Sequence, residues 1–264
     1  MQLRLICYGS KSLFAAPFLL RMPTALSIVQ NEDGFAVASD SFHYDMDAGT
    51  ALPGYVQKVF PFNMANLSLA YCLCGIITFN AMDKYGKQPL VFNLSIEVPR
   101  VLATMATMAT FRQFADAFGK RICTKLRKAT KLIPQRKPTE THVLLLGYYN
   151  GAPGLAVVEI RSANSFEYDV DVANVPHSTV SGCFPGALRD RLYDDPIFEP
   201  FRAKDCPHSG IQRAIEIARQ AVLACYDPAV RTKYPEAKVV GGPIHVAKIT
   251  LAGGFEWVEQ LHQG

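Results

Sequence analysis

Three side chains in the first part of the sequence could act together on an amide bond. Thr24 begins a short apolar stretch, Asp40 ends the next one, and Lys58 lies near the start of a third. A threonine hydroxyl is a weak nucleophile that needs a neighbouring base. An ammonium group such as that of Lys58 would lower the pKa of a nearby amine or hydroxyl, and the carboxylate of Asp40 would hold the lysine in place. These residue types suggest amide hydrolysis.

Each of the three residues also has an ordinary structural explanation. A threonine at a strand start is commonly a β-forming residue, an aspartate at a strand end is commonly a turn residue, and a lysine is commonly exposed to solvent. Only the ordered set, in its strand context, favours the catalytic interpretation.

The element that positions two of these residues is a predicted β-hairpin. Leu26 and Ile28, and then Phe35 and Val37, alternate with small or polar residues, which indicates two strands. The segment between them, Asn31-Glu-Asp-Gly34, has the composition of a tight turn. Thr24 therefore opens the first strand of the hairpin, and Asp40 closes the second.

This arrangement resembles the opening of a proteasome β-type subunit, within the N-terminal nucleophile (Ntn) hydrolases. The shared features are the Thr-led strand, the glycine turn, the strand ending in Ala38-Ser-Asp-Ser41 and the Lys58-Val-Phe60 strand. In that family a propeptide is removed autolytically, so that the threonine becomes the first residue and its free α-amine serves as the base. The resemblance implies a catalytic set in which Thr24 is the nucleophile and Asp40, Ser41 and Lys58 support it.

The resemblance continues along the chain to about residue 258. It implies that Ser181, in Ser181-Gly182, lies beside the nucleophile and helps to organise it, and that the backbone N–H of Gly75 contributes to an oxyanion hole. Residues 1–23 are then an N-terminal extension or propeptide, and residues 24–264 form one Ntn-hydrolase domain. A start at Met22 is an alternative explanation for the preceding segment.

The order of the predicted elements indicates an α+β fold with largely antiparallel strands. We expect the following elements: the hairpin, strands at 58–62 and 66–74, helices at 95–108 and from 110 onward, strands at 142–149, 155–161, 166–172 and 178–182, helices at 185–194 and from 209 onward, and a terminal hairpin at 239–258. We expect loops at 41–53, 76–91 and 195–208. The resemblance adds a four-layer αββα sandwich, with two antiparallel sheets flanked by helices.

Composition limits the possible partners. The chain has 264 residues, of which 49% are hydrophobic and 19% charged, and this is an ordinary globular composition. A formal charge of +4 is too small to indicate nucleic-acid binding, and no apolar run approaches the length of about 20 residues needed to span a membrane. We therefore expect neither a nucleic-acid nor a membrane partner.

The cysteines indicate the compartment and argue against a zinc site. There are seven, an odd number, scattered mostly in apolar stretches, as expected of buried free thiols in a reducing, cytoplasmic environment. Cys72 and Cys74 alternate on a strand, but no second Cys or His pair follows at zinc spacing. No P-loop or Rossmann motif is present, so we expect no metal and no cofactor.

Two functions remain open from the sequence. The first is a threonine-type peptidase or hydrolase of small amides, assembled by analogy into a homo-oligomeric ring; the intact Thr24, Asp40 and Lys58 favour it. The second is an inactive homologue that acts as a structural or binding subunit of an oligomer. Pro23 favours the second, because it restricts the backbone where self-processing relatives have glycine. Val240, which stands where the family has a polar residue before Gly-Gly, also favours it.

Overall fold

The computed structural model describes residues 4–5, 24–45, 50–64, 67–75, 77–82, 89–130, 139–162, 166–173, 179–185, 188–192, 194–202 and 208–260. The N-terminal extension predicted at residues 1–23 lies almost wholly outside these residues. Within it only Arg4–Leu5 (β1) is described, and β1 pairs in parallel with Thr179–Cys183 (β13).

The predicted hairpin forms the centre of a six-stranded sheet. Its strands are β2 (Leu26–Asn31) and β3 (Gly34–Ser39), and the Asn31 side chain accepts a hydrogen bond from the Gly34 N–H at 3.1 Å across the turn. The strand order is β1-β13-β2-β3-β14-β15, with β14 at His245–Thr250 and β15 at Gly254–Glu259. Apart from the pairing of β1 with β13, the neighbouring strands of this sheet are antiparallel.

A five-stranded antiparallel sheet faces the first one. Its order is β12-β11-β10-β7-β6, so strands from before and after the helical pair lie side by side. The strands are β6 (Val59–Met64), β7 (Leu67–Gly75), β10 (Thr139–Tyr149), β11 (Ala152–Ser162) and β12 (Phe166–Val172). The predicted antiparallel meander over residues 142–172 is confirmed.

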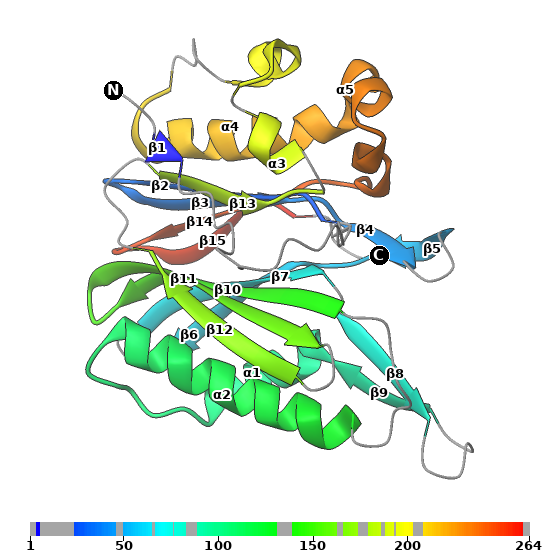
Figure 1. Cartoon of the computed structure of the whole chain (residues 1–264). Helices are drawn as coiled ribbons and strands as arrows, with labels where there is room; N and C mark the ends of the chain where they lie inside the picture. Colours follow the sequence, from blue (N-terminus) through cyan, green and yellow to red (C-terminus); the bar gives the residue numbers. More distant parts are fainter. Residues whose placement is uncertain are drawn as a thin grey trace.

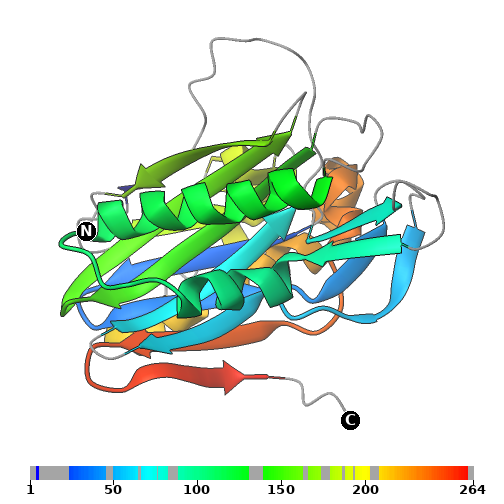
Figure 2. The same ribbon diagram turned by 90° about the horizontal axis from the view of Figure 1, so that it is seen from below.

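Helices lie on the outer side of each sheet (Figure 1). They are α1 (Leu94–Ala103) and α2 (Phe111–Thr130) on the five-stranded sheet, and α3 (Leu188–Arg191), α4 (Gly210–Leu223) and α5 (Pro228–Lys233) on the six-stranded sheet. Figure 2 shows α1 and α2 side by side across the strands that they cover. The α+β class with antiparallel sheets is therefore confirmed. No helix in the described ranges is both long and apolar enough to cross a membrane.

Apolar side chains fill the space between the two sheets. Because side chains alternate along a strand, β2 and β3 each present one row inward and one row toward α4. The inward row of Leu26, Ile28 and Phe35 packs with Leu144 and Leu146 of β10. The outward row belongs to a separate cluster with α4. Strands buried on both faces explain why the hairpin is the most strongly patterned stretch of the sequence.

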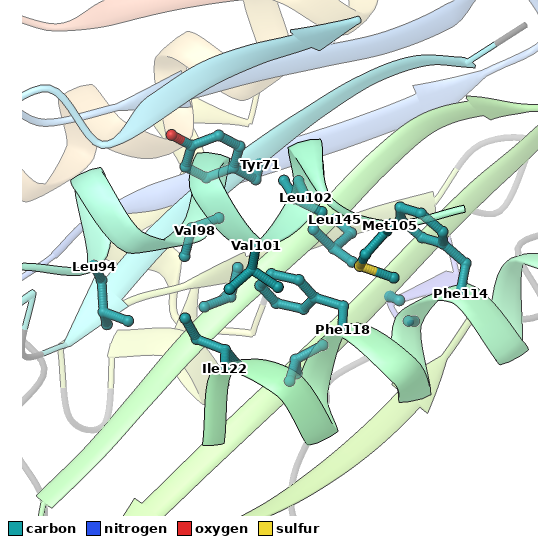
Figure 3. Close-up of a cluster of buried hydrophobic side chains, with 14 of the residues drawn as sticks. Tyr71, Leu94, Val98, Val101, Leu102, Met105, Phe114, Phe118, Ile122 and Leu145 are labelled. Atoms are coloured by element: carbon teal, nitrogen blue, oxygen red, sulfur yellow. The ribbon is translucent and has the colours of Figure 1, made fainter. Parts of the chain in front are cut away.

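The helix α2 packs on the five-stranded sheet as the helical spacing of its apolar residues predicts. Figure 3 shows Phe114, Phe118 and Ile122 pointing into one cluster with Leu145 of the sheet. The predicted capping box is also present, since the Gln113 N–H donates to Thr110 Oγ1 and the Thr110 N–H donates to Gln113 Oε1, each at 3.2 Å.

Two segments predicted as loops contain strands. Residues 41–53 include β4 (Phe42–Asp45) and most of β5 (Thr50–Tyr55), and residues 76–91 include β8 (Thr78–Met82) and part of β9 (Pro89–Asn93). Each pair forms its own two-stranded sheet. Nearly all of β5 is exposed, so neither face needed apolar residues, and the period-two signal was absent.

Other predicted boundaries were wrong where tertiary contacts end an element. The first helix ends at Ala103 rather than 108, because the backbone N–H and C=O of Met108 bond to the Tyr149 hydroxyl at 2.7 and 2.8 Å. Within the described part of the helix predicted at 185–194, α3 is the helical segment. Three short 3-10 helices are also present: η1 (Pro196–Phe201) lies in the segment predicted as a loop, η2 (Ala224–Tyr226) extends α4, and η3 (Pro235–Val239) ends at the first residue of the predicted terminal hairpin.

Candidate active site

The hairpin brings its two polar ends together. Thr24 and Ala25 lead into β2, Asp40 follows β3, and the Asp40 N–H donates to the Ala25 carbonyl at 3.0 Å. Thr24 and Asp40 are both buried, with 1% and 0% of their surface exposed. The antiparallel register of β2 and β3 therefore fixes the backbone next to Thr24 against Asp40.

Lys58 reaches the same place from the other sheet. It immediately precedes β6, and its carbonyl accepts a hydrogen bond from the Leu73 N–H of β7 at 2.9 Å. The Lys58 ammonium donates to Asp40 Oδ1 at 2.8 Å, and both side chains are almost fully buried. The same oxygen accepts the N–H of Ala25 at 2.9 Å. One carboxylate oxygen thus joins the lysine to the residue that follows Thr24.

The second oxygen of Asp40 is also engaged. It accepts the N–H of Phe42 at 3.2 Å and that of Gly241 at 3.5 Å. Burial raises the pKa of the Asp40 carboxyl, and the Lys58 ammonium and the N–H groups of Ala25 and Phe42 oppose that rise. A carboxylate with this many donors has one fixed position, so it can orient the lysine.

Buried thiols occur on both sides of the six-stranded sheet. Burial raises the pKa of Cys72 and Cys74, which belong to the cluster between the sheets, and that of Cys225 in the cluster on the side of α4. A raised pKa keeps a thiol protonated, and a protonated thiol is a poor nucleophile. The cysteines that the structure describes are all free and buried.

Three residues hold the loop at Gly241-Gly242, and two of them, Tyr226 and Arg231, were not identified from the sequence. The Tyr226 hydroxyl donates to the Gly242 carbonyl at 2.7 Å, and Arg231 donates to the Val240 carbonyl at 2.7 Å. Ser41 also holds the loop. Its N–H donates to the Gly241 carbonyl at 3.3 Å, and its hydroxyl donates to the Pro243 carbonyl at 2.7 Å. These contacts fix the loop although the polar residue expected at position 240 is absent. Side chains that bond to backbone carbonyls across irregular segments follow no periodic spacing, so the sequence showed no pattern for them.

The structure gives Ser181 a backbone position only. It lies in β13, and its Cα pairs with that of Ile28, four residues along β2 from Thr24. Its side chain lies outside the described part of the structure, so its catalytic role stays a prediction.

Gly75 ends β7 with a φ of +88°, and a Cβ there would lie 2.5 Å from the Glu140 carbonyl oxygen. Close strand packing already requires this glycine.

His245 is a further polar residue close to the ion pair. It pairs with Ser39, the neighbour of Asp40, and is 5% exposed. Its Nδ1 is buried without a hydrogen-bond partner in the described residues, and its ring packs against Trp257 at a centroid distance of 5.9 Å. Burial lowers the pKa of His245, so its imidazole is neutral near neutral pH.

The chain is similar in fold to a solved structure of Anbu, the ancestral beta-subunit, from Yersinia bercovieri. The identity is 12% and the TM-score 0.51, over 90% of this chain and 88% of that chain. A Gly-1 mutant of Anbu from Hyphomicrobium sp. strain MC1 is 11% identical, with a TM-score of 0.46 over 89% of this chain and 85% of that one. No protein-family profile and no curated protein matches the sequence.

These findings correct the expected family. The sequence resembled the opening of a proteasome β-type subunit, whereas the solved structure that matches with a TM-score of 0.51 is of Anbu, a distinct protein. The resemblance rested on a hairpin with polar ends, and such a hairpin reflects local strand and turn chemistry that does not separate proteins of one fold. At 12% identity the similarity establishes a shared fold and no more.

Proposed function

We propose that this protein is a threonine-type amide hydrolase in which Thr24 becomes the nucleophile after the preceding segment is removed. The observation that carries the proposal is the single oxygen of Asp40 that accepts both the Lys58 ammonium and the Ala25 N–H. This contact fixes a positive charge beside the backbone of Thr24. An ionisable group that is desolvated and has a specific charge partner is a candidate for a functional site.

The proposed reaction needs only groups at this place. The Thr24 oxygen attacks an amide carbonyl, and its proton passes to the freed α-amine and then to the departing amine. The resulting ester is hydrolysed by water, which releases the acid and restores the threonine hydroxyl. An α-amine has an unperturbed pKa of about 8, and the ammonium of Lys58 lowers it toward the range in which it accepts a proton at neutral pH.

The proposal extends to the architecture and the setting of the enzyme. We infer a four-layer αββα sandwich, a peptide or small amide as substrate, and assembly into a homo-oligomer. The name of the similar protein contains "beta-subunit", and this supports an oligomer. Buried free thiols support a reducing, cytoplasmic location.

The test begins with the chain itself. We would express the protein from Met1, determine its intact mass and its N-terminal sequence, and treat it with a peptide that carries a C-terminal electrophile. The proposal predicts a chain that starts at Thr24 and a covalent adduct on its first tryptic peptide. Thr24→Ala should lower amide hydrolysis by at least about 10³-fold. Thr141→Ala is the matched control, since Thr141 is equally buried, at 1% exposure, in the other sheet.

One observation favours the inactive alternative. Pro23 is bonded to the Thr24 nitrogen in the precursor, and a proline at this position restricts the backbone that self-cleavage requires. A subunit without activity would keep Pro23, form no adduct and still assemble. If the purified chain retains Pro23 and Thr24→Ala hydrolyses amides at the wild-type rate, the hydrolase proposal fails.

A further inference from the structure

A second polar cluster lies on the five-stranded sheet, apart from the Asp40–Lys58 pair. Glu140 and His142 are two residues apart on β10, and Glu159 of β11 lies directly opposite His142. Side chains alternate along a strand, and Leu144 of β10 and Val157 of β11 belong to the cluster between the sheets. The three polar side chains therefore project from this same inner face.

The three side chains converge on one point. One ligand atom from each of Glu140, His142 and Glu159 lies within 4.8 Å of the other two. His142 Nε2 lies 2.6 Å from Glu140 Oε1, so the imidazole already faces a carboxylate. Metal–ligand bonds of about 2.0–2.2 Å in a tetrahedral site place the donor atoms roughly 3.3–3.6 Å apart. Shifts of about 1 Å would bring all three to that spacing.

Contacts behind two of these groups hold them in place. Cys183 Sγ of β13 lies 3.7 Å from His142 Nδ1, on the opposite side of the ring from Glu140. At 2.6 Å from Glu140 Oε1, Nε2 donates its N–H to that carboxylate in the metal-free protein, and a metal ion would take the place of this proton. Arg161 Nε donates to Glu159. Metal-binding histidines and carboxylates in proteins have such outer partners, which fix the tautomer and the orientation of the ligand.

Charge and exposure also suit a cation. The two carboxylates carry two negative charges, which face Arg161 and the Nε2–H of His142 in the metal-free protein, and a divalent ion would replace that proton. The His142, Glu140 and Glu159 side chains are 10%, 24% and 16% exposed, so an ion can enter and the ligands are still largely removed from water. Partly buried carboxylates that lie this close repel one another, and a divalent ion removes that repulsion.

We propose that Glu140, His142 and Glu159 bind one divalent transition-metal ion, of the Mn²⁺ or Zn²⁺ type. One imidazole nitrogen and two carboxylate oxygens form a ligand set that suits these ions. No metal-ligand spacing was visible in the sequence, because Glu159 reaches the other two residues through the pairing of β10 with β11. The site does not depend on Thr24 being a nucleophile.

The experiment uses the full chain, treated with a chelator and then titrated with Mn²⁺. Mn²⁺ is chosen because it prefers carboxylate and imidazole ligands to the thiols of the cysteines. Binding is followed by electron paramagnetic resonance, in which free Mn²⁺ gives a sharp signal that is lost on binding. We expect one bound ion per chain. Glu140→Gln and Glu159→Gln should each weaken binding by at least about tenfold, and the double variant should abolish it.

Two further variants keep the test decisive. Glu256→Gln is the matched control, because Glu256 is a strand glutamate in the other sheet that pairs with Lys248 at 3.0 Å; its Mn²⁺ affinity should equal that of the wild type. Cys183→Ala leaves the three ligands intact and should weaken binding by about tenfold through the loss of the outer contact. Circular dichroism verifies the fold of every variant. The proposal would be overturned if the wild-type chain bound no Mn²⁺ at millimolar concentration. It would also be overturned if the Glu140 and Glu159 variants bound Mn²⁺ with the wild-type affinity.

Discussion

Removing either partner of the buried Asp40–Lys58 pair should destabilise the protein about as much as removing both. The ammonium and the carboxylate are 2.8 Å apart, with side-chain exposures of 3% and 0%. Loss of one partner from such a pair leaves an uncompensated buried charge and costs about 3–5 kcal/mol. We therefore expect this cost for Asp40→Asn and for Lys58→Met.

The double variant contains no buried charge at this place. It loses a salt bridge and keeps an acceptor at position 40 for the Ala25 N–H, which bonds there at 2.9 Å in the wild type. Its cost should not exceed that of one single variant, so the coupling energy between the two sites is about 3–5 kcal/mol. Non-additivity of this size occurs only when two groups interact directly.

Urea unfolding, followed by the fluorescence of the single tryptophan, Trp257, measures these quantities. Trp257 packs against Phe255 at a centroid distance of 5.0 Å, so its emission should change on unfolding. With an m-value of about 3 kcal/mol/M, each single variant should lower the midpoint by roughly 1–1.7 M.

The exposed pair of Lys248 and Glu256, 3.0 Å apart on β14 and β15, provides the control cycle. Lys248→Met and Glu256→Gln should each change stability by less than about 1 kcal/mol, with little coupling. If the costs at Asp40 and Lys58 simply add in the double variant, the two groups are not a desolvated pair, and the reasoning about the site is wrong.

Two further predictions concern a loop and an acid-sensitive contact. Gly242 has a φ of +72°, and a Cβ there would lie 2.7 Å from Ser41 Oγ, so Gly242→Ala should cost about 1–3 kcal/mol in the urea midpoint; an unchanged midpoint would contradict this. The Lys233 ammonium, the Tyr234 hydroxyl and the Ile197 N–H lower the pKa of Asp195, so its stabilisation is complete above its unfolded value of about 3.9, declines as the pH falls below that value and is fully lost only below the lowered folded pKa. The gap between the urea midpoints of wild type and Asp195→Asn should therefore be smaller at pH 3 than at pH 6, and an equal gap at both pH values would refute the assignment.

Local chemistry in the sequence determined the elements that are buried on one or both faces. The hairpin at Thr24–Asp40, the helix α2 with its capping box and the meander from β10 to β12 all agree with their patterns, because apolar periodicity and turn residues act within a few positions. Exposed strands such as β5 carry no such periodicity, since neither face is selected for burial. The sequence alone therefore missed them.

The sequence also named the residues of the ion pair, but only through their order along the chain. That one oxygen of Asp40 joins Lys58 to the backbone beside Thr24 depends on how two different sheets face each other. Tyr226 and Arg231 reach the glycine loop from short helices, and Glu159 meets His142 through the pairing of two strands in one sheet. Contacts between residues far apart in sequence leave no spacing rule, because strand order and sheet packing decide which side chains meet. The sequence thus determined the hairpin and its polar ends, and the tertiary structure decided what those ends touch.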